Sequence, residues 1–149
     1  MLFFNGPNYL HSSIEKDRIY HMQNRIEINE IVEIAAKRLL QFDYMISAIL
    51  FGSFAEGREN DMSDIDIGVL VSKELSLIEV GFLAAGMEMV FKRRVDLVIL
   101  NDLSKKNPLL AYEIISKGNL MFCRDQEKLV ELKTNTILSF LDTLPLRDA

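Results

Sequence analysis

The chain has 149 residues, 49% of them hydrophobic, and a formal net charge of -5 at pH 7. This length suits one globular domain, and the acidic balance argues against a protein that holds nucleic acid mainly through its phosphates. The single cysteine, Cys123, excludes an internal disulfide, and no apolar run reaches the roughly 18 residues of a membrane span. We therefore expect a cytoplasmic protein with neither nucleic acid nor membrane as a direct partner.

The beginning of the chain differs in pattern from the rest. Residues 1–21 mix aromatic, polar and charged side chains without a period, so we expect an N-terminal extension there, flexible or non-native, and a single domain over 22–149. Helical spacing, with Asn24 and Glu27 placed as a cap and its partner, predicts a helix over about 25–42. Apolar runs then predict strands over about 46–51, 64–71 and 95–100, and a short edge strand over 119–123.

Two of the later helices carry clear start signals. Ser76 and Glu79 form a capping box before a helix whose inner face is lined by Val80, Leu83, Ala84, Met87 and Val90. Asn107 and Pro108 supply a cap and a first-turn proline for a helix that ends near Gly118.

A last helix is predicted from Asp125 to about Leu141, with a wide apolar surface. The whole order of elements predicts an α/β (α+β) fold in which one sheet is covered by helices. The connection between the first two strands has only about a dozen residues, so it has room for a short helix at most.

Gly52 and Ser53 open that short connection. If a strand ends at Phe51 and a short helix begins at about Ser53, Gly52 permits a sharp turn and the close approach of a ligand. The amides of the first helical turn and the Ser53 hydroxyl then point outward as donors, which favours phosphate. The structural alternative is that Ser53 only caps a helix and Gly52 only turns the chain.

Asp64 and Asp66 stand at the head of the second predicted strand. Residues two apart in a strand share a face and lie roughly 6.5 to 7 Å apart. Such carboxylates repel each other unless a cation lies between them, and magnesium is the cation expected with oxygen ligands and phosphate. Gly68, on the same face, would leave space for a ligand. Alternatively, these are solvated aspartates at a strand start, or Asp64 caps a turn.

A third carboxylate, Asp96, lies inside the apolar run of the third predicted strand. An unpaired ionised aspartate there would cost several kcal/mol, so it needs a partner or a metal. If its strand neighbours that of Asp64, it can join the same cluster, hold a metal and accept a proton from an attacking hydroxyl. The structural alternative is a salt bridge to Arg93 or Arg94.

These residues together carry a resemblance. Gly52-Ser53, ten further residues, Asp64-Ile65-Asp66 and a later Asp96 resemble the minimal nucleotidyltransferase (MNT) branch of the DNA polymerase beta superfamily, over roughly residues 27–122. The resemblance implies a polymerase-beta-like fold with a small mixed sheet, ATP as nucleotide and two magnesium ions. It also implies transfer of a nucleoside monophosphate to a hydroxyl with release of pyrophosphate.

The resemblance also implies roles for individual residues. Ser53 and the amides after Gly52 would hold the terminal phosphates. Asp64 and Asp66 would bind the metals, and Asp96 would complete the metal site and act as base.

One departure concerns the turn itself, where many relatives carry an arginine. This chain has Ala55-Glu56-Gly57 instead, so Arg58 or Lys73 would have to help bind the triphosphate.

The acceptor is suggested by the size of the chain. Small stand-alone members of this branch resemble the antitoxin of a toxin-antitoxin pair whose toxin is a HEPN-domain ribonuclease, which implies a hetero-oligomer and adenylylation of a toxin tyrosine. The apolar residues Leu138, Phe140 and Leu141 would suit such a partner, although packing against the chain's own sheet explains them equally well. The alternatives are a catalytically weak antitoxin that acts by contact, and a nucleotidyltransferase for a small molecule such as an aminoglycoside.

Overall fold

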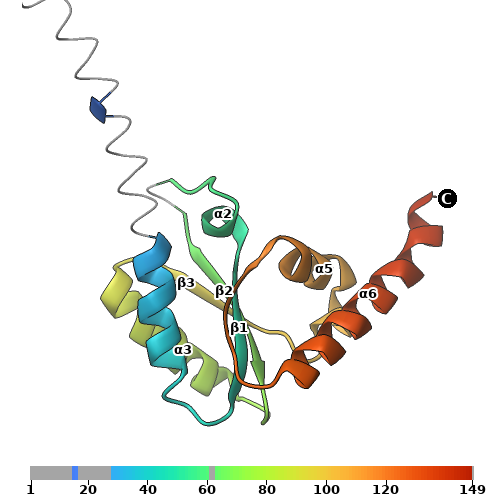
Figure 1. The fold of residues 1–149 in the computed structure, drawn as a ribbon, viewed down its shortest axis with the longest axis horizontal. Helices are drawn as coiled ribbons and strands as arrows, with labels where there is room; N and C mark the ends of the chain where they lie inside the picture. Colours follow the sequence, from blue (N-terminus) through green and yellow to red (C-terminus); the bar gives the residue numbers. More distant parts are fainter. Residues whose placement is uncertain (1–14, 17–27, 61–62, 149) are drawn as a thin grey trace, which may run out of the picture.

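The computed structural model describes residues 15–16, 28–60 and 63–148 (Figure 1). A helix covers 28–39 and ends in a turn, three residues before the predicted end at 42. The predicted cap at Asn24 and Glu27 lies outside the described residues, as does all of the predicted extension except residues 15 and 16.

Four strands form one mixed sheet in the order β3-β2-β1-β4. β1 is antiparallel to both β2 and β4, whereas β2 and β3 are parallel. The strands are β1 (Met45–Phe51), β2 (Ile65–Val71), β3 (Val95–Ile99) and β4 (Asn119–Cys123). The α/β (α+β) class, the mixed sheet and the edge position of β4 are therefore confirmed, and each strand boundary lies within one residue of its prediction.

The helices are α2 (Gly52–Ala55), α3 (Leu77–Phe91), α4 (Leu103–Lys106), α5 (Pro108–Lys117) and α6 (Gln126–Asp148). α3 is the crossover that a parallel pair such as β2 and β3 requires. It begins with the predicted capping box, in which Ser76 and Glu79 each accept a hydrogen bond from the other's backbone amide. Asn107 likewise caps α5 by accepting from the Leu110 amide at 3.2 Å.

Helices cover both faces of the sheet (Figure 1). The helix over 28–39 and α3 lie on one face, and α4, α5 and α6 lie on the other. Alternation along β2 divides its side chains between two cores: Ile65, Ile67 and Val69 enter the first, and Leu70 enters the second. The face that carries Asp66 is therefore covered further along the strand and open only near its beginning.

This second core corrects the expectation for Gly68. A Cβ at Gly68 would lie 2.8 Å from the Leu100 side chain, so Leu100 occupies the space that we expected a ligand to use. Gly68 serves the packing of the sheet, and the prediction that it opens room for a ligand is wrong.

Two parts of the helical layer were not predicted. The short α4 had no counterpart in the sequence analysis, and α6 continues past Leu141 and through Pro145 to Asp148 (Figure 1). Within α6, Leu129, Leu132 and Thr136 are buried, whereas Val130, Leu138 and Leu141 are about half exposed. The apolar surface of α6 is therefore only partly used by the chain's own core.

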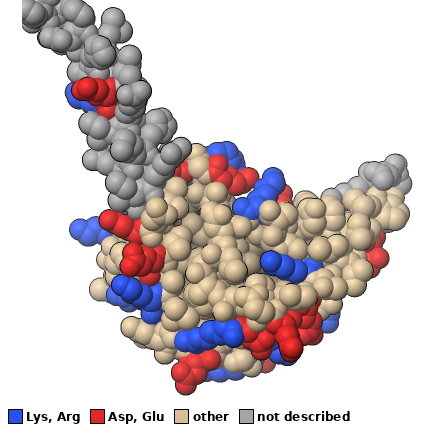
Figure 2. All heavy atoms as spheres, in the orientation of Figure 1, with Lys and Arg blue, Asp and Glu red and all other residues tan. Residues whose placement is uncertain are grey.

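The surface carries charges of both signs. In Figure 2, acidic and basic side chains alternate around the edge of the visible face, and uncharged residues fill most of its centre. Among the helices within the described ranges, none has both the length and the apolar character needed to cross a membrane.

Candidate active site

The Gly52 turn and the Asp66 carboxylate lie directly against each other. Phe51, the last residue of β1, pairs with Asp66 in the sheet, and Gly52 follows with a φ of +74°. A Cβ at Gly52 would lie 2.2 Å from Asp66 Oδ2. Glycine is thus needed here both for its backbone conformation and for the carboxylate that approaches it.

Three carboxylates converge beside this turn. Asp66 pairs with Asp96 across the parallel strands, so their side chains leave the sheet on the same face, and Asp64 precedes β2 by one residue. Burial, followed by the negative charges of Asp96 and Asp64, raises the pKa of Asp66 to about 6. The structure therefore brings the three predicted residues together closely enough for their charges to interact.

Arg93 holds the loop that leads into this cluster. Its Nη1 donates to the carbonyl oxygens of Asn60 at 3.0 Å and Ser63 at 3.2 Å, and its guanidinium lies 5.2 Å from the centre of the Phe54 ring in α2. Within the described part of the chain, neither Arg93 nor Arg94 forms a salt bridge with Asp96. The structural alternative for Asp96 is therefore wrong.

Ser53 lies inside α2 rather than at its cap. The helix begins at Gly52, its N-cap residue is Phe51, and no side chain caps it. Because Ser53 is not the cap, the purely structural explanation for it does not hold. Its carbonyl accepts from the Arg58 amide at 2.9 Å, which closes the turn.

A cavity of about 250 Å³ opens beside the turn. It lies between Gly52, Arg58 and the end of α5, where the Lys117 side chain reaches it. Arg58 Nη2 lies 2.5 Å from Glu56 Oε2, and Lys117 Nζ lies 3.8 Å from Glu56 Oε1. Arg58, and after it Lys117, lower the pKa of the Glu56 carboxyl.

Lys117 was missed by the sequence analysis, because a lysine in the last turn of a helix is ordinary. The available signal was Gly118, whose missing side chain lets α5 approach the end of β1: a Cβ there would lie 2.4 Å from the Ile49 side chain. Lys73, by contrast, follows the other end of β2, where it pairs with Glu79 at 3.3 Å and covers the Tyr44 ring. The expectation that Lys73 could bind the triphosphate is wrong.

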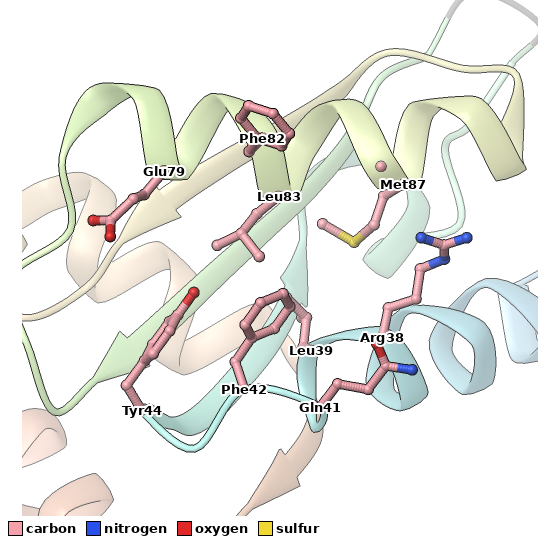
Figure 3. Close-up of a pocket in the computed structure, with 10 residues that line it drawn as sticks. Arg38, Leu39, Gln41, Phe42, Tyr44, Glu79, Phe82, Leu83 and Met87 are labelled. Carbon is pink, nitrogen blue, oxygen red and sulfur yellow. The ribbon is translucent and has the colours of Figure 1, made fainter.

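A larger cavity, of about 370 Å³, has none of the three carboxylates in its lining. Figure 3 shows the residues that line it. It is formed between the end of the helix over 28–39 and α3, with Arg38, Tyr44 and Glu79 at its edges and Phe82 and Met87 among its apolar residues. Tyr44 precedes β1, so this cavity is at the opposite end of that strand from Gly52. Although this cavity is the larger of the two, none of the candidate site residues lines it.

The metal-binding role of the carboxylates stays a prediction. Over residues 15–16, 28–60 and 63–148, no group of three or more His, Cys, Asp or Glu side chains has an arrangement that would already hold a metal ion. Asp96 is exposed and Asp64 and Asp66 are half-buried, so their side chains have room to adjust.

Comparisons with known proteins agree with this geometry. Residues 29–127 match the family model described as polymerase beta, nucleotidyltransferase. Because the match covers most of the chain, the protein belongs to the polymerase beta nucleotidyltransferase family. It is 31% identical over 93 residues to the protein adenylyltransferase MntA of Shewanella oneidensis strain MR-1. The matched region is 62% of this chain and 65% of that relative, slightly less than two thirds of its length.

Two solved structures share the fold and 25% of the aligned sequence. One is a chain of a toxin-antitoxin crystal structure with AMP-PNP, with a TM-score of 0.67 over 78% of this chain and 92% of that chain. The other is a chain of a mutant of the toxin-antitoxin pair MntA-HpeT, with a TM-score of 0.64 over 76% of this chain and 88% of that chain. The polymerase-beta-like fold that the sequence predicted is confirmed.

Proposed function

We propose that this protein transfers AMP from ATP to a hydroxyl group of a partner protein, with release of pyrophosphate. The observation that carries the proposal is the contact between the Asp66 carboxylate and the Gly52 turn, with Asp64 and Asp96 beside it. This places a cluster of negative charge against backbone that can approach a phosphate. The similarity to a relative named a protein adenylyltransferase supports the same reaction.

The roles follow from position. Gly52 and Ser53, at the start of α2, hold the phosphates through backbone amides and the hydroxyl, and Arg58 at the end of the turn adds a positive charge. Asp96 is the exposed carboxylate of the three, so it is the one able to meet an incoming hydroxyl and accept its proton. Asp66 and Asp64 supply the remaining negative charge.

Magnesium fits these residues. Three carboxylates whose mutual repulsion contributes to the raised pKa of Asp66 form an oxygen donor set that a hard divalent cation would stabilise. Asp64, Asp66 and Asp96 would hold the metal, and nucleotide phosphates would supply further oxygen ligands. Bound there, Mg²⁺ would neutralise charge on the phosphoryl oxygens.

The proposed acceptor is a HEPN-domain toxin in a hetero-oligomer. The two solved structures at 25% identity are both toxin-antitoxin assemblies, and one contains the ATP analogue AMP-PNP. On this chain, Leu138 and Leu141 of α6 are half exposed, which offers an apolar surface to a partner. Phe140, which we expected on that surface, instead stacks on Tyr112 with ring centres 3.9 Å apart. We also propose a cytoplasmic location, where ATP is available and Cys123 stays a free thiol.

The test is AMP transfer to a purified HEPN-domain toxin, the proposed acceptor. With labelled ATP and magnesium, the wild type should label that protein, and Asp64→Asn/Asp66→Asn should not. Asp102→Asn is the matched control, because Asp102 is exposed, lies beyond the other end of β3 and makes no capping hydrogen bond.

Equal labelling by the double variant would exclude the proposed site. Loss of labelling without loss of toxin neutralisation in cells would favour the antitoxin that acts by contact alone. Pyrophosphate release with an aminoglycoside, and none with the HEPN-domain protein, would favour the small-molecule acceptor.

A further inference from the structure

Two cations face one carboxylate at the cavity beside Gly52. Arg58 comes from the loop after α2, and Lys117 comes from the last turn of α5, 59 positions later in the chain. Both contact Glu56, one at each carboxylate oxygen, and all three side chains line the cavity of about 250 Å³. Glu113 adds a second acidic residue to the lining, and Phe51 and Leu110 contribute apolar surface.

This arrangement adjoins the proposed nucleotide site. Gly52 is part of the cavity wall, and the Asp66 carboxylate lies against the same glycine. A triphosphate whose first phosphate lies at the carboxylates can therefore extend past Gly52 toward Arg58 and Lys117. The Glu56 carboxylate now lies between those two cations, where a terminal phosphate group would form charge-assisted hydrogen bonds.

We propose that Lys117 acts with Arg58 to bind the terminal phosphates of the nucleotide, and that Glu56 occupies both cations until the nucleotide displaces it. The inference rests on the proposed function, because it assumes a nucleoside triphosphate at Gly52. A triphosphate carries more negative charge than a single carboxylate, so it can compete successfully for the two cations. The ion pairs with Glu56 are exposed and correspondingly weak, which keeps this displacement easy.

The experiment compares the binding of ATP and AMP to full-length variants by calorimetry in the presence of magnesium. Lys117→Gln should weaken ATP binding about fivefold, the size of one exposed charge pair, and should leave AMP binding unchanged because AMP has no terminal phosphates. Glu56→Gln should strengthen ATP binding by a similar factor and should also leave AMP binding unchanged. Lys133→Gln, an exposed lysine on α6, is the control and should alter neither.

A double variant isolates the coupling between these residues. If Glu56 acts by occupying Lys117, the gain from Glu56→Gln should be smaller when Lys117 is already glutamine. Circular dichroism melting of each variant shows whether the fold is kept, which is expected because Glu56 and Lys117 both lie at the surface.

The possible failures are distinguishable. Unchanged ATP binding by Lys117→Gln, or equal weakening of ATP and AMP binding, would overturn this inference while leaving the proposed function intact. Absence of ATP binding by the wild type would overturn the proposed function and the inference with it.

Discussion

The two ends of β2 differ in how their polar groups are paired. At the end of the strand, the Asn101 side chain donates to the Val71 carbonyl at 2.7 Å and accepts from the Val71 amide at 3.1 Å. At the beginning, burial and then the charges of Asp96 and Asp64 raise the pKa of Asp66 to about 6. At Val71 the backbone polar groups are hydrogen-bonded, whereas at Asp66 like charges lie close together, which lowers the stability of the fold. The difference indicates that the end of β2 at Val71 serves the fold. The beginning of β2 at Asp66 is the end that we propose for binding and chemistry.

The largest effect is expected for Asp96→Asn. Removing the proposed proton acceptor should lower the rate of AMP transfer by about 10² to 10⁴, the range found for general acid-base groups. Stability should change little, because Asp96 is exposed. Single-turnover kinetics with labelled ATP would measure the rate, with Asp102→Asn as the matched control. A rate within a factor of about two of the wild type would remove Asp96 from the proposed chemistry.

The second-largest effect on AMP transfer is expected for Gly52→Ala, with Gly57→Ala as its control. Both glycines have positive φ, +74° and +70°, so each alanine should cost about 1–2 kcal/mol of stability. A Cβ meets Asp66 Oδ2 only at position 52, whereas at Gly57 it meets nothing within 4 Å. Displacement of the carboxylate should therefore lower AMP transfer about 10²-fold for Gly52→Ala alone. Equal activity of the two variants, measured at a temperature where both are folded, would contradict the role of this contact.

Asn101→Ala probes the satisfied end of β2. Loss of both hydrogen bonds to Val71 should reduce the free energy of unfolding by about 1–2 kcal/mol, because the backbone amide and carbonyl lose their partner. Urea unfolding measures this change. AMP transfer below the melting temperature should equal that of the wild type, and a selective loss of activity would show that the two ends are not independent.

The smallest effect concerns Asp66→Asn without divalent cations. The pKa of Asp66 is raised from 3.8 to about 6 in the folded protein, so its ionisation destabilises the fold progressively as pH rises through that window and fully above it. The variant should therefore gain about 1 kcal/mol at about pH 7.5, a value reduced for the half-exposed carboxyl, and nothing at about pH 3.5. Urea unfolding at both pH values checks this. A destabilised variant at the higher pH would contradict the raised pKa of Asp66, which burial and then the charges of Asp96 and Asp64 produce.

The sequence predicted those parts of the molecule that depend on local signals. The capping box of Ser76 and Glu79 and the Asn107-Pro108 pair fixed the starts of α3 and α5, and apolar runs located each strand to within one residue. Strand alternation predicted that Asp64 and Asp66 share a face, although β2 itself begins at Ile65. The condition for Asp96 to join them, a strand beside that of Asp64, is met by the parallel pairing of β2 and β3.

The parts that could not be predicted depend on packing between distant segments. Lys117 reaches the turn because Gly118 lets α5 approach β1, and Leu100 fills the space beside Gly68 because the second face of the sheet is also covered. Neither contact leaves a local pattern. The last helix was predicted to end near Leu141, yet α6 continues through Pro145 to Asp148. A proline removes one backbone donor, and the long helix tolerates that loss near its end.

The most direct test of the central claim is a crystal structure of this protein with Mg²⁺ and AMP-PNP. We expect magnesium contacted by carboxylate oxygens of Asp64, Asp66 and Asp96, with the phosphates beside the Gly52 turn. Magnesium bound elsewhere, or an Asp96 carboxylate turned away from the other two, would contradict it.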